Sequence, residues 1–274
     1  MATTATGRAL TEQHRQAQLA IRARFLRELT RLWPMISVDR LDETASLWIN
    51  AVVDLILAYR EQSAGRSLTY YDALRTAEFG EPLSHRALYE TLGAPNLGAI
   101  RASLLITGPV HVKSLIGKGI SAPRATMMAL TEVSGAASRH VLNGGRQLLV
   151  DATEKDETTS HYARVTGADP CAFCAMLASR GAIYVSRATA IHTTARAKAG
   201  AGHQYHDRCV CTVEPSWDRD APLPGRADEF AKLWTESTGD VSGYSRAKGK
   251  RGKKVNNKLK AFRAAYDKQR ADSS

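Results

Sequence analysis

All four cysteines of this 274-residue chain lie within residues 171–211. They form the pair Cys171-Ala-Phe-Cys174 and, with a histidine, the run His206-Asp-Arg-Cys209-Val-Cys211. Two thiolates separated by two residues can converge on one metal ion, and a second group of Cys and His about thirty residues later can complete a tetrahedral zinc site. The pattern predicts a small module whose short segments are held together by zinc.

Five candidate ligands are available for the four positions of such a site. The predicted metal ligands are Cys171, Cys174, His206 and Cys209, with Cys211 as the replacement if the site is all-cysteine. With five protein ligands on offer the site can close fully, and the sequence has no His-x-Glu or His-Glu-x-x-His signature. We therefore expect one structural zinc per chain and no catalytic residue.

Three other interpretations of the cysteines stay open. They could be reduced structural cysteines without a metal. A disulfide pair is disfavoured, because no secretory context is apparent and Cys209 and Cys211 are too close for an easy mutual bridge. A cysteine nucleophile with His206 as base and Asp207 or Asp169 as its orienting partner would make a thiol hydrolase, which would leave three cysteines unexplained.

The residues around the first pair predict its local structure. Asp169 is a good N-cap, Pro170 suits the first helical position, and Gly181 suits the left-handed position after a short helix. The first cysteine pair would then lie in the first helical turn, where the positive end of the helix dipole favours thiolates. Residues 183–185 and 210–213 are predicted as short strands that pair and join the two groups.

Helices are predicted over most of the first 150 residues. One runs from Thr11, its predicted N-cap, to Trp33, and a second begins around Asp42. Weaker helical patterns follow between residues 70 and 92, and a Gly- and Pro-rich stretch over 93–123 predicts short segments. A long helix is expected over about 123–151, with Gly144-Gly145 as its weak point.

The positive charge is concentrated at the C-terminus. The chain has 38 Lys and Arg against 27 Asp and Glu, and residues 241–274 hold 11 of the basic and only two of the acidic residues. Such a segment favours contact with nucleic acid or another polyanion, although a solvated tail is the plain alternative. We expect a loop over 241–255 and then a short basic helix capped at Asn256-Asn257. The predicted polyanion contacts are Lys248, Lys250, Arg251, Lys253, Lys254, Lys258, Lys260 and Arg263.

The predicted fold class is mainly α with a small α+β module. The expected parts are a helical N-terminal region over 1–110, a module with the Cys/His zinc cluster over 111–220, and a short helix with the basic tail over 221–274. A short helix carrying Phe230 and Trp234 on one face opens that last part. Neither a signal peptide nor a membrane span is expected, because the best apolar run is interrupted by Asn50 and Asp54.

Three stretches of the sequence resemble one known family. They are the run His140-Val-Leu-Asn-Gly-Gly-Arg146, the segment Tyr162–Gly181 around the first cysteine pair, and Tyr205-His-Asp-Arg-Cys-Val-Cys211. Together they are similar to the phage Mu F-like minor head (head morphogenesis) proteins, in the branch carried by actinobacterial phages. Asp207 stands where many members carry Pro, at a position that is not a ligand.

The resemblance implies a minor capsid protein of a tailed phage. Such a protein would associate with the portal protein, with scaffold or major capsid protein as further partners, and would be packaged in the head interior after assembly in the host cytoplasm. The basic tail would meet packaged DNA. Some relatives are labelled capsid maturation proteases, so a cysteine hydrolase that processes scaffold or shell protein is the alternative function. No membrane partner is implied.

Overall fold

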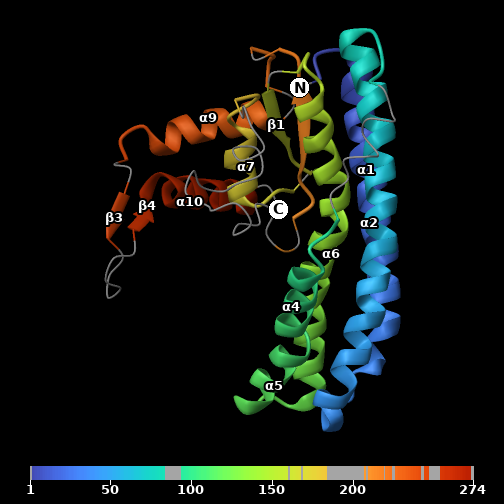
Figure 1. The fold of residues 1–274 in the computed structure, drawn as a ribbon. Coiled ribbons are helices and arrows are strands. Elements are labelled where there is room, and N and C mark those ends of the chain that lie inside the picture. The colour runs from blue at the N-terminus through green and yellow to red at the C-terminus, as the bar shows by residue number, and fades with distance from the viewer. Residues whose placement is uncertain are drawn as a thin grey trace.

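Three long helices form the main body of the molecule (Figure 1). They are α1 (Ala5–Leu32), α2 (Leu41–Phe79) and α6 (Ala122–Lys155), and they pack along one another. The structure is a computed structural model that describes residues 2–83, 94–159, 161–167, 169–183, 207, 209–218, 220–223, 226–241, 244–246 and 254–272. Within these residues, no helix combines the length and the apolar character that a membrane span requires.

The long helices that the apolar periodicity predicts are confirmed, and α2 takes in the first part of the weaker pattern over 70–92, whose part from residue 84 lies outside the described residues. Two 3-10 turns, η1 (Trp33–Met35) and η2 (Val38–Arg40), join α1 to α2, and the Gly- and Pro-rich stretch forms the short helices α4 (Leu97–Thr107) and α5 (Pro109–Gly117). The predicted start of the first helix is wrong. Thr4, not Thr11, caps α1, and its hydroxyl accepts a hydrogen bond from the Gly7 amide at 2.9 Å.

Two apolar cores lie one after the other along the long helices. One packs α4 and α5 against the first half of α2, and its fully buried side chains include Phe25, Trp48 and Ile56. The other joins the second halves of α2 and α6 to the C-terminal part of the chain. Each core buries a stripe of side chains from several helices, so the long helices are stabilised along their full length.

A layer of small and polar residues lies along α1, α2 and α6 where they approach closely. His14 of α1 bonds Ser67 Oγ of α2 at 2.9 Å, and the Ser63 hydroxyl donates to Gln18 at 2.7 Å. A Cβ on Gly145 of α6 would lie 2.3 Å from Ser67 Oγ. The predicted weak point at Gly144-Gly145 is therefore wrong, because the missing side chains are what allows the helices to approach.

A small part with short strands stands beside the upper half of the long helices (Figure 1). It contains β1 (His161–Val165), α7 (Ala172–Ala178), β2 (Thr212–Ser216) and α9 (Arg226–Thr238). β1 and β2 pair antiparallel, with Ala163 opposite Glu214. β2 confirms a strand after the second cysteine group, but its partner is β1 rather than residues 183–185. Ile183 is in no strand, and residues 184 and 185 lie outside the described residues.

The C-terminal segment folds onto this small part. α10 (Asn257–Asp272) begins as predicted, with Asn256 Oδ1 accepting from the Leu259 amide at 3.0 Å. Phe262 and Tyr266 are fully buried against α7 and α9, and the Tyr266 hydroxyl donates to the carbonyl oxygen of Pro170 at 2.7 Å. The expected loop over 241–255 is partly wrong, because β3 (Tyr244–Arg246) and β4 (Lys254–Asn256) pair there.

The structure confirms a mainly helical fold with a small antiparallel sheet. Helices on both sides of residue 110 contribute to the same bundle, since α2 packs on both α4 and α6. The division into parts at residues 110 and 220 stays a prediction.

Candidate metal centre

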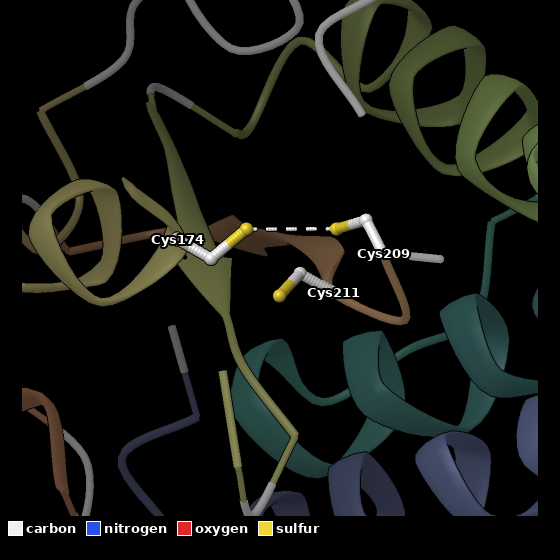
Figure 2. A group of neighbouring side chains, drawn as sticks. All are labelled: Cys174, Cys209 and Cys211. Atoms are coloured by element: carbon white, nitrogen blue, oxygen red, sulfur yellow. Dashed lines mark hydrogen bonds between the residues drawn. The ribbon is translucent and has the colours of Figure 1, made fainter. Parts of the chain in front are cut away.

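Three cysteine side chains meet in the interior of the small part (Figure 2). The Sγ atoms of Cys174, Cys209 and Cys211 all lie within 4.8 Å of one another, and those of Cys174 and Cys209 are 3.5 Å apart. Each side chain is 3–4% exposed. Two segments 35 residues apart in sequence therefore place three soft ligands around one point.

The first cysteine pair is positioned by the start of α7. Cys171 is itself the N-cap, and its Sγ accepts from the Cys174 amide at 3.4 Å. The predicted cap at Asp169 is wrong, because that carboxylate binds Arg270 of α10 at 2.6 Å. Gly181 does adopt the predicted left-handed conformation, with φ of 65°. α7 thus begins later than predicted but still presents both cysteines from its first turn.

The second pair is fixed by a buried arginine of α6. Arg146 donates through Nη2 to the carbonyl oxygen of Cys209 at 2.6 Å and through Nε to that of Cys211 at 2.9 Å. The guanidinium group of Arg146 is buried, so these charge-assisted bonds are shielded from water. Arg146 holds the backbone of both cysteines against the long helix.

A second arginine of α6 reaches the residues just before Cys209. Arg139 Nε donates to Asp207 Oδ1 at 2.7 Å, and the Arg139 side chain is only 8% exposed. Sequence reasoning missed the structural roles of Arg139 and Arg146. The available signal is that both interrupt the apolar face of a helix that is buried on several sides.

The cysteines influence each other's protonation. Hydrogen bonds with Cys174 and Cys211 lower the pKa of Cys209 to about 2, and the Arg146 guanidinium favours the same thiolate. Hydrogen bonds with Cys171, Cys209 and Cys211, together with burial, raise the pKa of Cys174. Hydrogen bonding within the group therefore favours the thiolate form of Cys209. A bound cation would stabilise further thiolates as their protons leave.

The donor set and its spacing fit a thiophilic metal ion. Ligands at about 2.3 Å from a tetrahedral zinc lie about 3.8 Å apart, whereas bonded sulfurs are only about 2 Å apart. The 3.5 Å between the Cys174 and Cys209 sulfurs agrees with a shared ion, and none of the four cysteines forms a disulfide. Cys174, Cys209 and Cys211 could therefore hold a metal ion.

The other predicted ligands of the metal site are Cys171, which the structure describes, and His206, which it does not. Cys171 is half-buried beside Cys174, and its sulfur is the main influence on the pKa of that thiol. His206 lies outside the described residues. Cys211, predicted only as a replacement, belongs to the same sulfur group as Cys209. Cys171 and His206 remain the two predicted candidates for a fourth position.

The predicted polyanion contacts are described only in part. Lys248, Lys250, Arg251 and Lys253 lie outside the described residues, and Lys254 belongs to β4. On α10, Lys260 and Arg263 are exposed and Lys258 is half-buried. These three side chains lie on a helix whose opposite face packs in the core.

Comparison of the sequence with known proteins shows the family to which the chain belongs. The chain is 29% identical over 169 residues to the Gene 15 protein of Mycobacterium phage D29, a match that covers 51% of this chain and 61% of the phage protein. The chain thus spans about three fifths of that relative's length. No solved structure matches. Residues 5–237, which include the long helices and all four cysteines, match the family described as VG15 protein, and the chain belongs to this family.

Proposed function

We propose that the protein is a minor capsid (head morphogenesis) protein of a tailed phage, assembled in the host cytoplasm and packaged in the head interior. The observation that carries this proposal is the family match over residues 5–237 together with the similarity to a protein of phage D29. The Mu F-like resemblance of the cysteine-containing segments points to the same role. Its direct partner would be the portal protein, with scaffold or major capsid protein as neighbours.

In this proposal the cysteine group binds one structural zinc ion per chain. The sulfur spacing and burial support zinc, and the arginine bonds to the backbone of Cys209 and Cys211 support a preformed site. The bound ion would join the start of α7 to the start of β2. Since a metal that binds only the folded state adds its binding free energy to stability, zinc would stabilise this small part directly.

Exposed apolar side chains at the end of the molecule far from the cysteine group support a protein partner. They lie on α4, α5 and the first turns of α6, helices that contact one another at the lower end of Figure 1. The most exposed are Leu97, Ile106, Val110 and Met127. Exposed apolar side chains on neighbouring helices are typical of interaction sites, and we assign this face to the portal protein. The basic face of α10 lies on the part that carries the cysteines and is assigned to packaged DNA.

Co-expression with the portal protein of the same phage tests the proposed partner. We expect the two proteins to co-purify, and the double variant Ile106→Asp/Val110→Asp to lose the portal. Ile183→Asp, which places the same charge at an exposed apolar residue on the other part of the molecule, is the matched control and should retain it. Failure of the unaltered chain to bind the portal, with both proteins folded, would contradict the proposal.

The alternative function, a cysteine hydrolase that matures the capsid, requires a reactive thiolate that substrate can reach. Cys209 has the lowered pKa that such a nucleophile needs, but its side chain is 4% exposed and its neighbours are further thiols. The burial supports the structural role. Cleavage of scaffold protein by the purified chain, abolished by Cys209→Ser in a still-folded protein, would favour the hydrolase instead.

A further inference from the structure

A cavity of about 320 Å³ lies between α1, the ends of β1 and α7, and the start of α9. None of the cysteines lines it. Its charged lining residues are Arg8, Glu12, Arg15, Arg164, Glu214 and Arg226. The volume is within the range of small-molecule sites, roughly 300 to 1,000 Å³. Four guanidinium groups around one small cavity are the unusual feature, because like charges repel unless an anion or carboxylates balance them.

The two carboxylates of the lining already have strong partners. Glu214 is buried and accepts from the Ala2 amide at 2.7 Å, the Thr11 hydroxyl at 2.6 Å and the Tyr70 hydroxyl at 3.0 Å. Glu12 receives two hydrogen bonds from Arg15, at 2.7 and 2.5 Å. The described lining has four positive and two negative side chains, and two of its arginines have a carboxylate partner: Arg15 pairs with Glu12, and Arg226 pairs with Glu229 of α9 at 3.2 Å.

The arginines come from three elements and differ in how far they are buried. Arg8 and Arg15 are two turns apart on α1, Arg164 is 4% exposed within β1, and Arg226 is the first residue of α9. Arg8 donates to the Thr3 carbonyl oxygen at 2.5 Å. Buried Arg164 would need little ordering to bind an anion, whereas the exposed side chains of Arg8 and Arg226 would be ordered by the ligand.

The rest of the lining is apolar or small. Ala2, Val165, Gly167, Ala178 and Ala227 contribute to it. Such a surface accepts the carbon part of a ligand while the guanidinium groups bind its charged end. Arginine suits phosphate in particular, because its planar group forms paired hydrogen bonds with phosphate oxygens.

We propose that this cavity is a binding site for a small phosphate-bearing ligand. The phosphate group contacts Arg8, Arg15, Arg164 and Arg226, and any organic part lies on the apolar lining. Two sources share this chemistry, free inorganic phosphate or pyrophosphate and a small phosphate monoester. The site is independent of the portal surface and of the cysteine group.

Isothermal titration calorimetry at constant ionic strength tests this site with inorganic phosphate, pyrophosphate and glycerol 3-phosphate. We expect saturable binding of one ligand per chain. A preference for glycerol 3-phosphate identifies the organic source, and equal or tighter binding of the inorganic ions identifies the free anion. Arg226→Gln and Arg8→Gln should each weaken binding by about tenfold, since each removes a charge-assisted contact from an exposed position.

The matched control is Arg31→Gln, which removes the same charge from the exposed last turn of α1, at the far end of the helix. It should bind like the unaltered chain. The proposal is overturned if no probe binds saturably. It is equally overturned if Arg31→Gln and Arg226→Gln weaken binding alike, because the effect would then be one of net charge.

Discussion

Arg146 connects the long helix α6 to the backbone of both cysteines in the second pair. A buried guanidinium is costly unless its donors are satisfied, and here two of its bonds go to carbonyl oxygens that strand pairing leaves without partners. The interaction thus stabilises the protein and fixes the direction from which Cys209 and Cys211 reach the site.

Replacing Arg146 by Met should destabilise the metal-loaded protein by about 3 kcal/mol, because two buried carbonyl groups lose charged donors. Urea unfolding monitored by circular dichroism measures the loss, and metal release to a chelator should become faster. Arg66→Met, at an exposed position of α2, is the matched control. Equal unfolding midpoints for the two variants would show that Arg146 does not hold the site.

His14 gives the bundle a defined pH dependence. Burial lowers the pKa of His14 to about 4, while the unfolded chain has the ordinary value near 6.5. The unfolded state therefore binds more protons between these values, and stability falls as the pH decreases through that window. We expect a loss of about 2 kcal/mol between pH 7.5 and pH 5 from this group.

Urea unfolding at the two pH values checks the contribution of His14. His14→Gln keeps a polar side chain beside Ser67 but does not titrate, so its stability should change less with pH by about that amount. An unchanged pH dependence in this variant would mean that His14 is not buried in its neutral form.

The chemistry of the candidate site could be predicted from the sequence more readily than its supports. The cysteine spacing indicates a shared metal because the ligands are the cysteine side chains themselves, so residue type and spacing show them directly. The partners of Arg146 are backbone carbonyls, which leave no mark in residue type or spacing. The predicted N-cap of α7 is wrong for a similar reason. Asp169 is a good cap by residue type, but its carboxylate pairs with Arg270, and that contact depends on how α10 folds back onto α7.

At the scale of elements, the close approach of α2 and α6 depends on Gly145. A Cβ there would lie 2.3 Å from Ser67 Oγ and 2.9 Å from the Ser63 carbonyl oxygen. The second of these atoms is backbone and cannot move without shifting α2. The same packing explains why the Gly144-Gly145 pair does not weaken the helix.

Gly145→Ala should therefore destabilise the protein by about 1–3 kcal/mol through overpacking. Gly65→Ala on α2 is the matched control, since a Cβ there meets no atom within 4 Å. It should stabilise the protein slightly, by up to about 1 kcal/mol, because alanine favours the helix. Thermal unfolding of both variants measures the two effects, and the same sign for both would contradict the close-packing account.

The elements differ in how well their sequences predict them. The long helices carry apolar residues at helical spacing, so their existence follows from the pattern. β1 and β2 do not alternate: all five residues of β2 are buried, including Glu214 and Pro215, and β1 buries Arg164. Period-two alternation marks strands with one solvated face, and these strands have none. Their pairing depends on contacts between distant segments.

At the scale of the whole molecule, three features lie at different places. The apolar surface on α4 and α5 lies at one end, the cysteine group lies within the part beside the other end, and the arginine-lined cavity lies between α1 and α9. α6 links the first two, because it packs against α4 and α5 with its first half and bonds the cysteine segment with its second. We predict that removing a metal bound by the cysteine group affects the second half of α6 more than the first core.

The central claim is that the cysteine group holds a structural metal ion. Elemental mass spectrometry of protein purified under reducing conditions tests it most directly, with Cys174→Ser/Cys209→Ser as the variant. We predict one zinc per chain in the unaltered protein, none in the variant, and a marked loss of thermal stability when a chelator removes the ion. Metal-free protein that unfolds at the same temperature with and without added zinc would contradict the account.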